Sequence, residues 1–198
     1  TFERLNMLER WRGALSDDFA LMRALREAGL PIHFVPECLT PSLEDCGFRE
    51  LIEFTTRQLK ITRVYAPHFW KAVLLGSLLF VTVFFGGLAL VVTRAALGHS
   101  FLAPLLLLAL VFALGVGKAY VRWRAVLLPL AAYEKELRRG LWAHLLLWPL
   151  ASALYLYNAL AAAFSRRINW RGITYELKSP TETVIIDGVR PAETITNT

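Results

Sequence analysis

The sequence predicts an α/β segment followed by membrane α-helices, and three observations lead to this fold class. The 198 residues are 56% hydrophobic, and the apolar residues are concentrated between positions 70 and 164. The run 72–92 contains no charged residue, and at a rise of about 1.5 Å per residue it can cross a bilayer core of about 30 Å. Before position 66, helical patterns alternate with a short apolar run, which is typical of an α/β domain.

Residues 1–66 carry the α/β features. The apolar spacing predicts a helix over 17–28, capped by Ser16 or Asp17 and ended by Gly29. The apolar run 32–35 ends at a proline and predicts a buried strand. A second helix is predicted over 48–65, with Glu53 and Arg57 as an ion pair one turn apart.

Residues 67–164 are predicted to be membrane helices. Two of them, over about 70–93 and 101–120, are expected to form a transmembrane hairpin, with Tyr65 and Trp70 in the aromatic belt at its entry. Residues 118–140 form a basic interfacial loop, and the positive-inside rule places this loop in the cytoplasm. The segment 1–66 is then predicted to be cytoplasmic too, and the protein is predicted to be a multi-pass integral membrane protein.

A third apolar helix is predicted over 141–164, and its path allows two alternatives. Pro149 interrupts it, and basic residues crowd both ends: the cluster 135–139 on one side, and Arg166, Arg167 and Arg171 on the other. A simple crossing would place the last three outside, against the charge rule. We favour a re-entrant or interfacial helix over a full crossing. Residues 165–198 are predicted to form a short β element over 168–177 and then a loosely ordered polar tail from 181.

The net charge of +6 points to a membrane rather than to nucleic acid. The lysines and arginines flank the apolar spans, where attraction to anionic lipid and topology explain them. Cys38 and Cys46 lack a second pair or a histidine at ligand spacing. They are therefore interpreted as free thiols, not as a zinc site or a disulfide framework.

Three short motifs occur in a fixed order relative to the membrane helices. They are Ser16-Asp17-Asp18, Arg57-Gln58-Leu59-Lys60-Ile61, and, after the hairpin, Trp170-Arg171-Gly172-Ile173-Thr174-Tyr175. In this order the chain resembles the membrane-bound, processive-type glycosyltransferases of family 2, and among them ceramide glucosyltransferase and its bacterial relatives. The resemblance covers nearly the whole chain, but only the C-terminal half of such an enzyme. Because the chain begins at Thr1 and shows no signal peptide, we expect it to belong to a longer protein.

The resemblance implies a GT-A-type catalytic domain, of which residues 1–66 are the C-terminal part. By resemblance, Asp18 matches the catalytic base and Asp17 its acidic neighbour. The cationic motif implies binding of the donor diphosphate or the acceptor by Arg57, Gln58, Lys60 and Arg63, whereas Ile61 stands where the family has tryptophan. Trp170 and Arg171 match the active-site face. A divalent metal, Mg²⁺ or Mn²⁺, is implied, held by residues outside this chain.

The implied reaction is an inverting transfer of a sugar from a nucleotide sugar to the hydroxyl of a membrane lipid, as in glycolipid and sphingolipid synthesis. Such a transfer needs a carboxylate to deprotonate the acceptor and cations to stabilise the leaving diphosphate. Two alternatives stay open: a non-catalytic membrane anchor or lipid-binding subunit, and a fragment of a polysaccharide synthase. On the first alternative, Ser16-Asp17-Asp18 is only a helix cap and the cationic motif is a lipid-binding patch.

Overall fold

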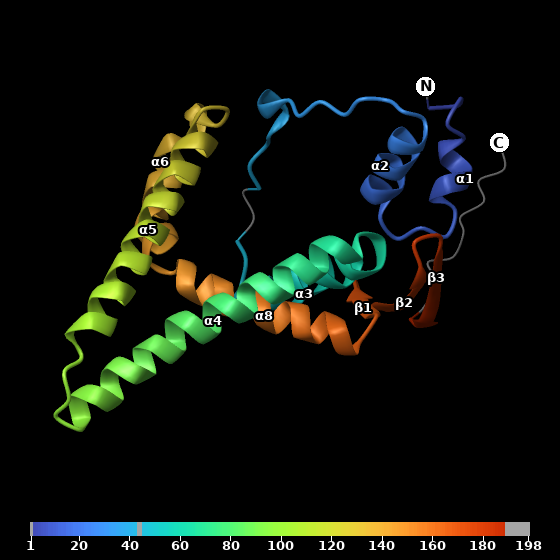
Figure 1. The fold of residues 1–198 in the computed structure, drawn as a ribbon. Helices are drawn as coiled ribbons and strands as arrows, with labels where there is room; N and C mark the ends of the chain where they lie inside the picture. The colour runs from blue at the N-terminus through green and yellow to red at the C-terminus, as the bar shows by residue number, and fades with distance from the viewer. Residues whose placement is uncertain (1, 43–44, 189–198) are drawn as a thin grey trace. The chain divides into compact units, whose positions relative to one another are not determined.

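A computed structural model describes residues 2–42 and 45–188, which fall into two compact units. The first unit comprises residues 1–33, 49–71 and 158–198, and the second comprises residues 34–48 and 72–157. The elements, in chain order (Figure 1), are α1 (Met7–Trp11), α2 (Asp17–Glu27), the 3₁₀ turn η1 (Pro36–Cys38), α3 (Phe48–Tyr65), α4 (Pro67–Ala96), α5 (Leu102–Leu127), the 3₁₀ turn η2 (Ala131–Tyr133), α6 (Glu134–Arg139), α7 (Leu141–Leu146), α8 (Trp148–Phe164), β1 (Arg167–Trp170), β2 (Ile173–Ser179) and β3 (Glu182–Asp187).

The two helices predicted in the first 66 residues are confirmed as α2 and α3. Ser16 caps α2, because its hydroxyl oxygen accepts a hydrogen bond from the backbone N–H of Phe19 at 3.4 Å. Gly29 follows α2 with a φ of +66°, a left-handed conformation that glycine adopts without strain. The backbone N–H of Leu30 then donates to the carbonyl oxygen of Leu25 at 2.9 Å, which satisfies one of the last carbonyls of the helix.

The strand predicted over 32–35 is wrong. These residues are assigned to no strand, they are exposed, and η1 follows them directly. Ile32 and Phe34 are 55% and 76% exposed, so the apolar run does not enter a core here. A strand needs a neighbour for its backbone N–H and C=O groups, and none of the three described strands pairs with this run.

The β element predicted over 168–177 is confirmed, and it belongs to a larger sheet. The sheet is antiparallel in the order β1-β2-β3, with Trp170 opposite Ile173 in the first hairpin. Arg171 and Gly172 form its two-residue turn with φ values of +52° and +80°, as tight hairpin turns require. The loose tail predicted from 181 is wrong for 182–187, because β3 pairs there with β2; residues 189–198 of that tail lie outside the described residues.

The first unit has a small core that joins helices to the sheet. Ile61 of α3, Ile168 of β1 and Leu177 of β2 are buried together. Partly buried apolar side chains pack on them from the turn before α2, from α2 and from α3: Leu15, Phe19, Val64 and Tyr65. A second contact joins α3 to α8, where the Thr56 hydroxyl donates to the side-chain oxygen of the fully buried Asn158 at 2.8 Å.

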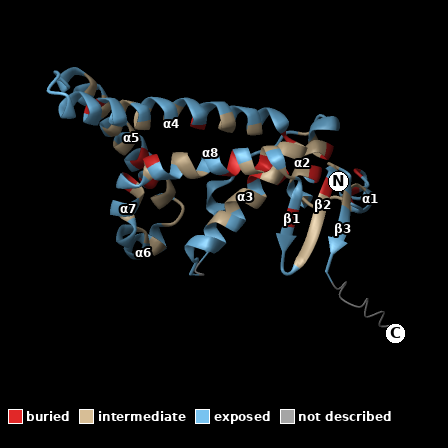
Figure 2. Ribbon diagram, turned by 90° about the horizontal axis from the view of Figure 1, so that it is seen from below, coloured by how far each residue is buried: buried red, intermediate tan, exposed pale blue. Residues whose placement is uncertain are grey.

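The second unit contains most of α4 and all of α5, which among the described residues are the two helices long and apolar enough to cross a membrane. Figure 2 shows α4 largely exposed, as expected of a helix whose apolar side chains face lipid. Helix α5 continues to Leu127 and α6 covers Glu134–Arg139, so most of the loop predicted over 118–140 is helical. The predicted third helix is divided: α7 ends at Leu146, and α8 begins at Trp148, directly before Pro149.

Candidate active site

A hollow of about 180 Å³ lies in the first unit, at the start of α2 and beside α3 and β1. Its lining brings together most of the residues that the sequence motifs singled out. The polar and aromatic lining residues come from all three elements: Ser16, Asp17, Asp18, Arg57, Gln58 and Trp170. Its apolar lining consists of Leu15, Ile61 and Ile168, which belong to the core of the unit or pack on it. The core therefore holds the motifs together.

The acidic pair occupies the first turn of α2. Because the Ser16 hydroxyl already caps this helix, neither carboxylate is needed for that role. The Asp17 side chain accepts a hydrogen bond from the backbone N–H of Asp18 at 3.1 Å. Among the described residues, no hydrogen bond or ion pair involves the carboxylate of Asp18, which is exposed at the hollow. Asp18 is thus the carboxylate available to a substrate.

Tyr65 fixes the turn that carries this pair. Its phenol oxygen accepts hydrogen bonds from the backbone N–H groups of Leu15, at 2.8 Å, and Ser16, at 3.3 Å. Its ring stacks on Phe19 with centroids 5.5 Å apart. The sequence analysis assigned Tyr65 to a membrane aromatic belt and missed this contact. No local pattern could have revealed it, since the partners are about fifty positions apart.

Arg57 carries the cationic charge of the hollow, and the structure corrects its predicted partner. Glu53 pairs with Arg49 at 2.9 Å, one turn in the other direction, and not with Arg57. The guanidinium of Arg57 instead lies 5.7 Å from the ring centre of Trp170 and 5.4 Å from that of Phe54. Both distances are typical of cation–π contacts. No carboxylate among the described residues pairs with this guanidinium, so its charge stays available for an anion.

Trp170 supplies an aromatic ring to the hollow, whereas the cationic motif in α3 has no tryptophan. At position 61 the chain has isoleucine, and this residue lines the hollow as part of the apolar floor. Trp170 comes from β1, more than one hundred positions later, and lies at 44% exposure beside Arg57. The sequence analysis predicted Trp170 on this face but not its contact with Arg57.

Three residues predicted for the site do not line the hollow. Lys60 donates a hydrogen bond from its Nζ to the carbonyl oxygen of Arg167 at 2.6 Å, and burial lowers the pKa of its ammonium group. Arg63 donates to the carbonyl oxygen of Ala162 and lies over the ring of Trp70 at 5.4 Å. Arg171 occupies the β1–β2 turn, 5.9 Å from the ring of Trp170. Lys60 and Arg63 bind α3 to the C-terminal part of the unit.

The hollow thus combines a carboxylate and a guanidinium that form no ion pair with any described residue, together with an exposed indole ring. A carboxylate can take a proton from a hydroxyl, and a guanidinium can hold a phosphate by two parallel hydrogen bonds. In the described part of the chain, no three His, Cys, Asp or Glu side chains gather as a metal site would require. The described residues therefore do not form a divalent-ion site by themselves.

Comparison with known proteins identifies the family. The sequence model described as "Glycosyl transferase family 21" matches residues 7–183, which is most of the chain and includes all three motifs. No curated protein and no solved structure matched the chain in the corresponding searches. The sequence analysis expected a family 2 enzyme similar to ceramide glucosyltransferase, and the family that matches is family 21. The chain therefore belongs to glycosyltransferase family 21 and is a glycosyltransferase.

Proposed function

We propose that this protein catalyses the inverting transfer of a sugar from a nucleotide-sugar donor to the hydroxyl of a membrane lipid of the ceramide type. The observation that carries the proposal is the hollow that both the Asp18 carboxylate and the Arg57 guanidinium line. Family membership supplies the sugar transfer, and the two apolar helices support a membrane-embedded acceptor. Donor, acceptor and stereochemical course are our inference from the chemistry of these groups and from the resemblance described above.

In the proposed step, Asp18 acts as the general base. Its carboxylate takes the proton of the acceptor hydroxyl while the hydroxyl oxygen attacks the anomeric carbon of the donor sugar. The new bond from oxygen to the anomeric carbon forms as the bond from that carbon to the diphosphate oxygen breaks. Attack on the face opposite the leaving group inverts the configuration. Asp17, whose side chain binds the Asp18 backbone N–H, holds the first turn in place.

The leaving nucleoside diphosphate gains negative charge as the bond breaks, and Arg57 is placed to stabilise it. The guanidinium offers bidentate hydrogen bonds to phosphate oxygens, while Trp170 restricts its position from one side. Gln58, from the same turn of α3, adds an amide that can donate to the diphosphate or to the acceptor.

The hollow is proposed to belong to a larger catalytic domain at the membrane surface. Residues 1–66 are proposed to complete a GT-A-type domain on the cytoplasmic face. The Mg²⁺ or Mn²⁺ ion that this chemistry uses is proposed to be bound by residues outside these 198, where it would neutralise charge on the donor diphosphate. Helices α4 and α5 are proposed to cross the bilayer and to hold the site at its surface.

The test is Asp18→Asn in the full-length enzyme, assayed with UDP-glucose and ceramide in membranes. Loss of a positioned general base should lower turnover by about 10²- to 10⁴-fold with little change in the melting temperature. Asp187→Asn is the matched control, because it removes an exposed carboxylate at the end of β3. Turnover within twofold of wild type in Asp18→Asn would refute the assignment. Transfer with retained configuration would refute the inverting mechanism.

A further inference from the structure

A second hollow, separate from the site described above, lies within the second unit between three helices. It has a volume of about 320 Å³. Helix α5 contributes Gly115, Lys118, Ala119 and Arg122, whose spacing of three or four places them on one face. Helix α8 contributes a similar stripe, Trp148, Ala151, Ser152 and Tyr155, and α4 contributes Phe80. The proposed glycosyl transfer uses none of these residues.

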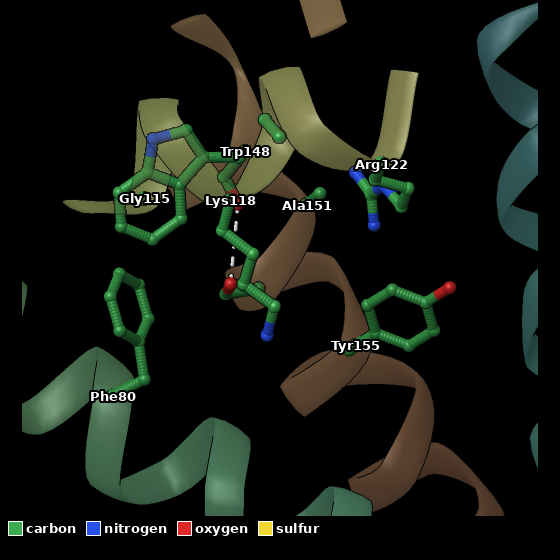
Figure 3. A pocket seen from close by; sticks show the side chains of 9 residues that line it. Phe80, Gly115, Lys118, Arg122, Trp148, Ala151 and Tyr155 are labelled. Atoms are coloured by element: carbon green, nitrogen blue, oxygen red, sulfur yellow. Dashed lines mark hydrogen bonds between the residues drawn. The ribbon is translucent and has the colours of Figure 1, made fainter. Parts of the chain in front are cut away.

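The hollow has an aromatic part and a cationic part. The ring of Trp148 packs between helices, with its centre 5.0 Å from that of Phe80 and 6.0 Å from that of Phe112. In Figure 3 the charged ends of Lys118 and Arg122 point toward the part of the hollow where Tyr155 lies. A ligand that fits both parts has an anionic group joined to an apolar body.

Lys118 and Arg122 do not stabilise the described part of the fold through ion pairs or hydrogen bonds. No hydrogen bond or ion pair joins Lys118 or Arg122 to another of the described residues, and the lining contains no carboxylate. The nearby basic residue Arg138, by contrast, is paired with Glu134 at 2.9 Å. Two unpaired cations at the end of an apolar helix form the type of basic pocket that binds anionic lipid head groups.

A neighbouring hollow of about 280 Å³ gives the apolar body of such a ligand a place to lie. It shares Phe80, Ser152 and Tyr155 with the hollow that Lys118 and Arg122 line. It continues along α4, where it is lined by Ala72, Val73, Gly76 and Ser77. No heavy atom outside the local helix backbone lies within 4 Å of the position that a Cβ at Gly76 would occupy. The groove is therefore open beside this glycine, and an acyl chain can lie along it.

We propose that this pocket binds one anionic glycerophospholipid, with its phosphate on Lys118 and Arg122 and an acyl chain along α4 toward Gly76. Zwitterionic phospholipids lack the net negative charge that the two cations complement, and water-soluble phosphates lack the apolar body that the groove accommodates. The bound lipid would hold α4, α5 and α8 together and would make the stability of the protein depend on anionic lipid.

The test measures lipid retention on the purified full chain by native mass spectrometry, so it does not depend on enzyme activity. Phosphatidylglycerol and phosphatidylcholine with the same acyl chains are compared, together with free glycerol 3-phosphate. Wild type should retain one phosphatidylglycerol in preference to phosphatidylcholine. Lys118→Gln and Arg122→Gln should each reduce this preference about fivefold, and the double variant should reduce it about 25-fold.

Control variants separate a pocket from general surface charge and from misfolding. Lys135→Gln with Arg139→Gln removes two exposed cations from the same unit outside the pocket and should leave the preference unchanged. Lys118→Arg with Arg122→Lys should retain it. Gly76→Leu keeps both charges but fills the groove, and it should cause loss of the retained lipid.

Three results would overturn the proposal. One is equal retention of the two phospholipids by wild type. The second is an equal loss of preference in the control pair Lys135→Gln with Arg139→Gln. The third is binding of free glycerol 3-phosphate as tight as that of phosphatidylglycerol, which would mean a phosphate site without a lipid. If the double glutamine variant does not fold, the single variants and Gly76→Leu decide the outcome.

Discussion

The phenol oxygen of Tyr65 accepts a hydrogen bond from the backbone N–H of Leu15 at 2.8 Å, so the last residue of α3 holds the turn that carries the acidic pair. Tyr65→Phe removes this acceptor and keeps the stacking on Phe19. The two backbone donors of the turn then lose their partner. We expect the free energy of unfolding to fall by about 1–3 kcal/mol, the cost of leaving a partly buried group unpaired.

Two measurements check this prediction: thermal unfolding, and sugar transfer by the enzyme. If the turn positions Asp18, transfer should fall by a larger factor than the loss of stability explains. Tyr157→Phe is the control, because this tyrosine is 56% exposed and lies in the second unit. Unchanged stability in Tyr65→Phe would show that water replaces the phenol without cost.

Trp170 is predicted to support Arg57 during donor binding. A cation–π contact at an exposed site contributes about 0.5–1 kcal/mol, so Trp170→Ala should lower kcat/KM for the donor about two- to fivefold. Trp170→Phe should recover part of the loss. In the background of Arg57→Ala the tryptophan replacement should have no further effect, because the two side chains act as one unit. Trp142→Ala, at a position 71% exposed, is the control. Additive effects of the two replacements would contradict the coupling.

Local signals in the sequence were sufficient for the helix ends but not for the pairing of strands. Ser16 and Gly29 mark the ends of α2 because capping is decided within one helical turn. The run 32–35 has the same kind of local signal for a strand, yet it stays unpaired because pairing depends on a second segment far along the chain. The converse holds at 184–186, where an apolar patch in a polar segment becomes part of β3 through pairing with β2.

For the candidate site, too, the sequence predicted some residues correctly and others not. The motifs predicted Asp17, Asp18, Arg57 and Gln58 at one place, and the hollow contains all four. The cationic motif predicted Lys60 and Arg63 at the same site, but a motif alone does not show what a side chain contacts. Lys60 reaches the carbonyl oxygen of Arg167, a partner more than one hundred positions away.

The burial of Lys60 predicts a pH dependence of stability. Burial lowers the pKa of its ammonium group below the ordinary value of 10.5, so in the window between the two pKa values the unfolded chain binds more protons than the folded one. The contribution of Lys60 to the free energy of unfolding therefore rises with pH across that window and is at its lowest below it.

Melting temperatures measured between pH 8 and pH 11 check this, because the window ends at the ordinary lysine pKa of 10.5. Lys60→Gln should flatten the rise, whereas Lys71→Gln, at an exposed position, should leave it as in wild type. The same slope in wild type and in Lys60→Gln would mean that the proton balance of other groups causes the rise.

The C-terminal strands are predicted to lie on the same side of the membrane as α3, and contacts within the first unit support this. Lys60 of α3 binds the carbonyl oxygen of Arg167, and Ile61 packs with Ile168, so α3 and β1 belong to one compact unit. If α4 and α5 both cross the membrane, as proposed, the chain returns to the side on which α3 lies. A third crossing would place β1 on the opposite side of the membrane from its own partners.

The length of α8 agrees with this argument. Its 17 residues, at about 1.5 Å per residue, extend about 26 Å, which is less than a hydrocarbon core of about 30 Å. The charges agree as well, because Lys135 and Arg139 lie before α7, and Arg166 and Arg167 lie after α8. We therefore expect α7 and α8 to enter the membrane without crossing it.

Labelling in sealed vesicles tests this with two single-thiol variants. One keeps the exposed Cys38, which lies before α4, and has Cys46→Ser. The other carries Ser179→Cys in a background with Cys38→Ser and Cys46→Ser. An impermeant maleimide should reach both thiols from the same side. Reaction of the thiol at position 179 from the side opposite Cys38 would mean that the chain crosses a third time, and Trp170 could not then lie beside Arg57.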